Sequence, residues 1–159
     1  MIKAFFALLK SLFFRPPILQ VAALCLRGQG AEIEVLLVRS LDSKRWIIPK
    51  GWPMRGKTLA QAAAMEAWEE AGVKGVISAQ PIGQFRYLKR RSGGFKQRCV
   101  AHVFELQVMS CHESFPESET RKPKWMTPGK AVKKIKDRGL RAIISARCAE
   151  SLVLDVVSG

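Results

Sequence analysis

The feature that constrains this chain most is a group of three glutamates at the end of one predicted helix. Residues 58–71 predict a helix, because they open with an N-capping threonine, are rich in alanine and are followed by a glycine. Glu66, Glu69 and Glu70 fall in its last turns, at spacings that place them on neighbouring faces. Carboxylates at this end repel one another and oppose the helix dipole. We therefore expect a compensating cation, and oxygen ligands suit Mg²⁺ or Mn²⁺.

A glutamate cluster is not by itself a metal site, because exposed helix faces often carry several glutamates. The flanking sequence favours a metal site here. The helix is preceded by a glycine-containing turn of sequence PKGWP at residues 49–53, and it closes with EEAGV at residues 69–73. We interpret residues 51–73 as the segment that carries the chemistry.

The length and the charge of the chain limit the number of domains and the kind of partner to expect. A chain of 159 residues fits one domain with one core. Lys and Arg total 27 against 13 Asp and Glu, which gives a net charge of +14. Such an excess either only keeps the surface solvated or attracts an anionic partner such as phosphate, nucleic acid or anionic lipid. We expect an anionic, phosphorylated small-molecule substrate.

Residues 1–17 form an N-terminal apolar segment ahead of a domain that spans residues 18–159. The segment is too short and too interrupted by lysines to be a transmembrane helix, and no small-residue cleavage site follows it. An amphipathic surface helix and a packing segment are the alternatives that stay open. The four cysteines are scattered without zinc-site spacing, which indicates reduced thiols and predicts a cytoplasmic protein.

The hydrophobic pattern along the rest of the chain predicts an α/β (α+β) order of elements. Apolar runs predict strands at residues 18–26, 32–38, 46–48, 76–88 and 98–108. The first two of these strands are expected to form a hairpin. Two further helices are predicted at residues 127–135 and 140–157. This order predicts a mixed sheet covered by helices on both faces.

Residues 51–73 resemble the signature of the Nudix family. That signature has a glycine, five residues, a glutamate, seven residues, Arg-Glu, an apolar residue, any residue, Glu-Glu, any residue, a glycine and an apolar residue. The positions that match are Gly51, Glu66, Ala67, Glu69, Glu70, Gly72 and Val73. Two positions depart from it, because Lys57 replaces the first glutamate and Met65 replaces the arginine.

The resemblance implies a Nudix-like α/β/α sandwich and a hydrolase that cleaves phosphoanhydrides with Mg²⁺ or Mn²⁺. Glu66 and Glu70 are implied as direct metal ligands, with the backbone carbonyl of Gly51 as a further ligand. Glu69 is implied either as a ligand or as the residue that orients or deprotonates water. The chemistry fits, because metal ions neutralise the charge that develops on phosphate oxygens.

Outside the signature, residues 45–51 and 116–125 are similar to segments of the diphosphoinositol polyphosphate and diadenosine polyphosphate hydrolases. In those enzymes basic residues near the glycine loop contact substrate phosphates, and an aromatic residue in the loop can line the pocket. The residues expected to bind substrate are Arg39, Arg45, Lys50 and Trp52. Glu117 is a further candidate acid, and Lys57 is a candidate partner for a helix carboxylate or a substrate phosphate.

A catalytically weak binding module is the alternative function. A Nudix scaffold without the signature arginine could sense a nucleotide or RNA, and basic residues at 89–98 and 130–138 support this reading. Aromatic residues are sparse in those stretches and no RNA-binding signature occurs, which makes nucleic acid the weaker candidate partner. The retention of all three glutamates favours the enzyme.

Restoring the signature pair tests whether the two departures slow the enzyme. In the family pattern the arginine anchors the glutamates through charge-assisted hydrogen bonds. Met65 cannot make such bonds, which leaves Lys50 and Arg55 as candidate contacts. We expect the double variant Lys57→Glu/Met65→Arg to turn over substrate severalfold faster, measured as phosphate or pyrophosphate release with Mg²⁺. A sharp loss of turnover would mean that the present residues belong to a different working network.

Overall fold

The structure, a computed structural model, describes residues 2–3 and 16–158 of the chain. The predicted N-terminal segment, residues 1–17, therefore lies for most of its length outside the described residues. Among the helices that the structure describes, none combines the length and the apolar character needed to cross a membrane.

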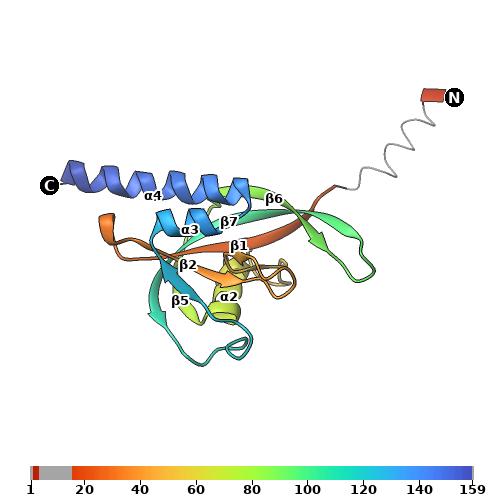
Figure 1. Cartoon of the computed structure of the whole chain (residues 1–159), viewed down its shortest axis with the longest axis horizontal. Coiled ribbons are helices and arrows are strands. Elements are labelled where there is room, and N and C mark those ends of the chain that lie inside the picture. Colours follow the sequence, from red (N-terminus) through yellow and green to blue (C-terminus); the bar gives the residue numbers. More distant parts are fainter. Residues whose placement is uncertain (1, 4–15, 159) are drawn as a thin grey trace.

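A mixed β-sheet forms the middle of the molecule (Figure 1). Its central strand β1 (Ile18–Arg27) pairs antiparallel with β2 (Glu34–Arg39) and parallel with the long strand β7 (Lys96–Cys111). The strand order is β3-β2-β1-β7-β5, while β4 pairs with β1, β6 with β7 and β8 with β2. The shorter strands are β3 (Trp46–Ile47), β4 (Lys50–Gly51), β5 (Val73–Ile77), β6 (Gly83–Arg90) and β8 (Lys124–Met126).

Helices cover both faces of this sheet. Helix α2 (Leu59–Ala71) lies on one face, and helices α3 (Pro128–Lys134) and α4 (Arg138–Ser158) lie on the other (Figure 1). Strand β1 serves both layers, because alternate side chains of a strand point to opposite faces. The residues facing α2 are Val21, Ala23 and Cys25, and those facing α3 and α4 are Ala22, Leu24 and Leu26. The predicted sandwich with a mixed sheet between helices is confirmed.

The two ends of α2 are fixed by its own sequence and by the segment that follows β7. At the start, Thr58 and Gln61 form a reciprocal capping box. At the end, Gly72 adopts a left-handed conformation with φ of 66°, and a side chain there would overlap the ring of Phe115. The backbone N–H of Glu117 donates to the carbonyl of Glu69 at 3.0 Å, which satisfies one of the carbonyls that a helix end leaves free. The glutamate end of α2 is thus held against the β7–β8 connection.

The predicted strand at residues 76–88 is wrong as a single element. The chain forms β5 and β6 there, and both pair antiparallel with β7, along different parts of that strand. Residues 78–82 interrupt the ladder, and they include Pro81, which has no N–H to donate. The predicted hairpin of the first two strands is confirmed, although residues 30–32 form a short 3-10 helix before β2 begins at Glu34.

Candidate active site at the end of helix α2

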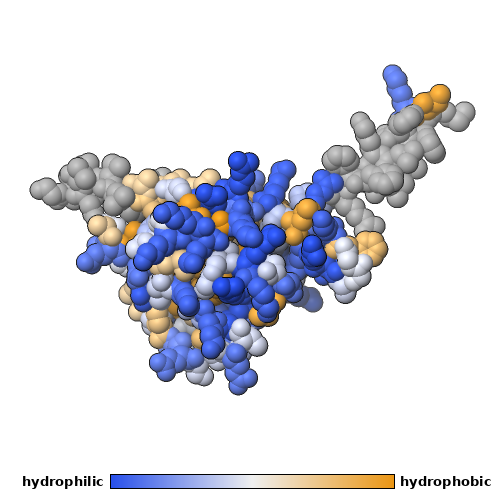
Figure 2. Space-filling model, viewed as in Figure 1, coloured by the Kyte–Doolittle hydropathy of each residue, from blue (hydrophilic) through white to orange (hydrophobic). Residues whose placement is uncertain are grey.

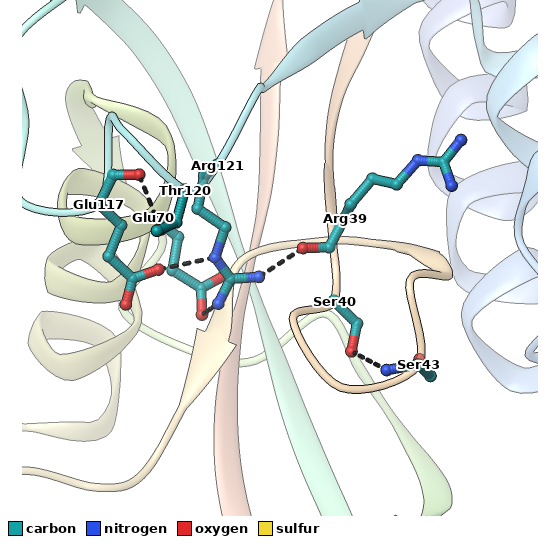
Figure 3. Close-up of polar contacts among 7 residues, drawn as sticks. All are labelled: Arg39, Ser40, Ser43, Glu70, Glu117, Thr120 and Arg121. Carbon is teal, nitrogen blue, oxygen red and sulfur yellow. Dashed lines mark hydrogen bonds and ion pairs between the residues drawn. The ribbon is translucent and has the colours of Figure 1, made fainter.

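The most deeply buried carboxylate of the predicted cluster is that of Glu70, in the last turn of α2. Glu70 is only 5% exposed. Its Oε1 lies 2.8 Å from Nη2 of Arg121, a residue that is 7% exposed itself (Figure 3). Its Oε2 is buried and has no hydrogen-bond partner among the described residues. A buried carboxylate oxygen without a partner is costly, and it is therefore a sign of a ligand site.

Arg121 joins three parts of the fold at this point. Its Nε donates to Oε2 of Glu117 at 2.6 Å, and its Nη1 donates to the backbone carbonyl of Arg39 at 2.6 Å. The guanidinium therefore connects the end of α2, the β7–β8 connection and the end of β2 (Figure 3). Of the residues that the structure describes, Arg121 forms the ion pair with Glu70, in place of the expected Lys50 or Arg55.

Sequence reasoning missed this role of Arg121, although two signals pointed to it. The absence of the signature arginine at Met65 required another source of positive charge. Arg121 also lies four residues after Glu117, the spacing at which a carboxylate and a guanidinium meet.

Glu66 lies against the glycine loop. A Cβ atom added at Gly51 would overlap the carboxylate of Glu66, so a side chain there would displace that carboxylate from its present place. Strand β4 places Gly51 there by pairing with β1 at Val21 and Ala22. The structure thus brings Gly51 and Glu66 together, as the resemblance implies.

The electrostatics of the cluster are those of crowded, partly buried acids. Burial raises the pKa of Glu66 to about 7, and the carboxylates of Glu69 and Glu117 add to this shift. Burial also raises the pKa of Glu70 to about 7, although the Arg121 guanidinium opposes the shift. Both acids therefore change charge near neutral pH, where a bound cation would favour their ionised forms.

The carboxylates do not form a closed metal-ligand set as they stand. Across the described residues, no three His, Cys, Asp or Glu side chains converge closely enough to hold an ion. Neighbouring carboxylates repel one another unless a cation lies between them. The donors nevertheless fit a hard divalent ion, because carboxylate oxygens are its preferred ligands and no residue that the structure describes bonds to Oε2 of Glu70.

The predicted substrate-binding residues lie around this centre in different settings. Arg39 contributes its backbone carbonyl to Arg121, while its guanidinium lies 4.7 Å from the ring centroid of Trp46. In Figure 3 the side chain of Arg39 points away from Glu70. Arg45 is exposed, on the turn before β3. The Arg39 guanidinium is therefore not directed at Glu70.

Lys50 and Trp52 lie on a neighbouring basic and aromatic surface. The Nζ of Lys50 lies 4.5 Å from the ring centroid of Tyr87, and burial together with Lys89 lowers the pKa of Lys50. The Nζ of Lys89 lies 4.8 Å from the ring centroid of Trp52. Two lysine ammonium groups thus lie over two aromatic rings in this region.

Lys57 and Met65, the two departures from the signature, lie together elsewhere. Both line a groove of about 630 Å³ along α2, and other residues lining it include Trp68, Lys74 and Ile77. Lys57 is exposed. Among the ion pairs of the described residues, none joins Lys57 to a glutamate of the cluster.

Comparison with known families supports the fold and the signature together. The sequence profile of the NUDIX domain matches residues 16–147. The chain belongs to the Nudix family. Curated relatives from Arabidopsis thaliana include Nudix hydrolase 12, mitochondrial, 33% identical over 108 residues, which are 64% of this chain and 51% of that protein. Nudix hydrolase 16, mitochondrial, is 32% identical over 75% of this chain and 68% of its own length. The chain thus spans about half to two thirds of these relatives.

Solved structures show the same fold at low sequence identity. The C. elegans Ap4A hydrolase superposes with a TM-score of 0.58 at 19% identity, covering 84% of this chain and 98% of that one. The NUDIX domain of Shewanella oneidensis NrtR, complexed with ADP ribose, gives a TM-score of 0.58 at 18% identity over 91% and 96% of the two chains. The Nudix fold predicted from the sequence is confirmed. The cytoplasmic location stays a prediction, since the two curated relatives carry mitochondrial names.

The metal-free protein should lose stability as the pH rises through the range in which Glu66 and Glu70 titrate. Folding raises the pKa of both from an ordinary 4.5 to about 7, so between these values the folded protein holds protons that the unfolded chain has released. Stability then falls with pH and levels off above about 7. Thermal melting in a chelating buffer measures this dependence. The variant Glu70→Gln should flatten it, and an unchanged pH dependence in that variant would contradict the assignment.

Proposed function

We propose that this Nudix protein is a hydrolase that cleaves a phosphoanhydride bond with Mg²⁺ or Mn²⁺. The observation that carries the proposal is the buried oxygen of Glu70 that has no partner among the described residues, on the same helix end as Glu66, whose carboxylate lies against Gly51. Such an oxygen is suited to a hard cation. The relatives support the reaction class, because the curated ones are named Nudix hydrolases.

Glu66, Glu70 and the backbone carbonyl of Gly51 would hold the metal, which supplies charge neutralisation on the phosphate oxygens and lowers the pKa of water. The remaining acids, Glu69 and Glu117, are the candidates for activating the attacking water. Glu69 would orient or deprotonate the attacking water, and Glu117, half-buried beside Arg121, is a second candidate for this role.

The proposed substrate is a nucleoside-diphosphate-linked compound, or a dinucleoside or diphosphoinositol polyphosphate. The net charge of +14 favours a polyanion. Hydrophilic residues cover most of the face drawn in Figure 2. The lysine ammonium groups over the rings of Tyr87 and Trp52 suit a phosphate chain attached to a flat group. Structural neighbours include an Ap4A hydrolase, an ADP ribose complex and an E. coli dihydroneopterin triphosphate pyrophosphohydrolase.

Replacing Glu70 tests the proposed function directly. The variant Glu70→Gln keeps the size of the side chain but removes a ligand charge. We expect it to lower Mg²⁺-dependent phosphate or pyrophosphate release by roughly 100-fold or more, because even changes outside the ligand sphere of a metal cost 10–100-fold. The exposed Glu113→Gln is the matched control and should behave as wild type. Full turnover in Glu70→Gln would contradict the proposal, and tight ligand binding without turnover in the wild type would favour the sensing module.

A substrate series of increasing charge tests the proposed specificity. Compounds with more than two phosphates should show the highest kcat/KM, because long-range attraction to a +14 protein raises the rate of encounter. The advantage should shrink between low salt and about 0.5 M salt, as screening shortens the reach of the charges. Equal cleavage of singly charged compounds at low salt would refute this specificity.

A further inference from the structure

The connection between β7 and β8 is docked on the glutamate end of α2 through backbone as well as side-chain contacts. The N–H of His112 donates to the carbonyl of Gly72 at 2.8 Å, and the N–H of Glu117 donates to that of Glu69 at 3.0 Å. A short turn then returns the chain, because the N–H of Arg121 donates to the carbonyl of Glu117 at 2.8 Å. These bonds fix the backbone from which the Arg121 side chain projects.

The guanidinium of Arg121 uses each of its three nitrogens on a protein acceptor. Nε meets Glu117, Nη2 meets Glu70, and Nη1 meets the backbone carbonyl of Arg39. At 7% exposure, this charge is kept from water and is balanced by two carboxylates. A planar guanidinium with fixed donor directions also sets the orientation of each acceptor.

The consequence for Glu70 is that its two oxygens have different surroundings. Arg121 holds Oε1 at 2.8 Å, while Oε2 is buried without a partner among the described residues. The ion pair therefore holds Oε1 in place and leaves Oε2 as the oxygen that a ligand could use. Met65, at the position of the signature arginine, lines the groove with Lys57 and has no hydrogen-bonding group with which to do this.

We propose that Arg121 is the positioning residue of this site, supplying from the β7–β8 connection the orientation of carboxylates that the Nudix signature assigns to an arginine within the helix. Arg121 acts through Glu70 and Glu117 and not by binding the phosphates of the substrate, because it is only 7% exposed and each of its three nitrogens already donates to a protein acceptor. The inference rests on the proposed function in that the oriented carboxylates are those proposed to hold the metal.

The test compares Arg121→Met and Arg121→Lys with Lys122→Ala, a change at the neighbouring exposed lysine. The first measurement is Mn²⁺ affinity in the absence of substrate, followed by electron paramagnetic resonance. We expect Arg121→Met to weaken Mn²⁺ binding by roughly 10–100-fold, which is the usual effect of removing a residue that orients a ligand. Arg121→Lys keeps the charge but lacks the planar arrangement of donors, and should recover only part of the Mn²⁺ affinity. Lys122→Ala should bind as wild type.

The second measurement is how the substitution changes kcat and KM separately. Loss of orientation should lower kcat by a similar factor and leave KM within about twofold, because the substrate contacts are not touched. A raised KM with unchanged kcat and unchanged Mn²⁺ affinity would overturn the inference and make Arg121 a phosphate ligand. If Arg121→Met does not fold, Arg121→Lys decides the matter, since wild-type Mn²⁺ affinity and kcat in that folded variant would overturn it too.

The two proposals can fail separately. Wild-type protein that binds Mn²⁺ but hydrolyses no phosphoanhydride, with binding weakened in Arg121→Met, would refute the hydrolase and support the positioning role. Wild-type turnover that depends on Glu70, with Mn²⁺ affinity and kcat unchanged in the Arg121 variants, would support the hydrolase and refute the positioning role.

Discussion

The ion pair between Glu70 and Arg121 is the interaction on which the arrangement of the site depends. Both side chains are almost completely removed from water, and two buried charges are tolerated only where each is satisfied by the other and by further hydrogen bonds. Arg121 meets this requirement by also binding Glu117 and the carbonyl of Arg39. The end of α2, the β7–β8 connection and the end of β2 are therefore held in one mutual arrangement.

The local parts of this arrangement could be predicted from the sequence, because neighbouring residues determine them. The capping threonine and the glycine after residue 71 set the limits of α2. The spacing of Glu66 and Glu70 predicted that they lie on neighbouring faces of the helix end, and the structure places Glu66 there against Gly51. Strand β1 was likewise predictable from a single continuous apolar run, since it is buried on both faces.

The parts that escaped prediction depend on pairings between distant segments. Arg121 lies 51 residues from Glu70 and 82 from Arg39, so its role follows from the path of β7 and β8 and not from local pattern. The division of residues 76–88 into two strands has the same origin, because β5 and β6 pair with different parts of the 16-residue strand β7. For Arg39 the sequence predicted a guanidinium that binds substrate, whereas its contact with Trp46 is set by the tertiary fold.

Because the β7–β8 connection docks on α2, the residues of this site come from two separate stretches of the sequence. In a chain with the full signature, one contiguous segment contains both the glutamates and the arginine, so that segment could be transferred to another scaffold as a whole. Here residues 51–73 would carry all three glutamates to a new host but leave behind the arginine that holds Glu70. Insertions between Glu117 and Arg121 would also break the turn that brings both side chains to the helix. A change that keeps the Glu70–Arg121 pair must therefore preserve two separated stretches of sequence, and the shorter one lies outside residues 51–73.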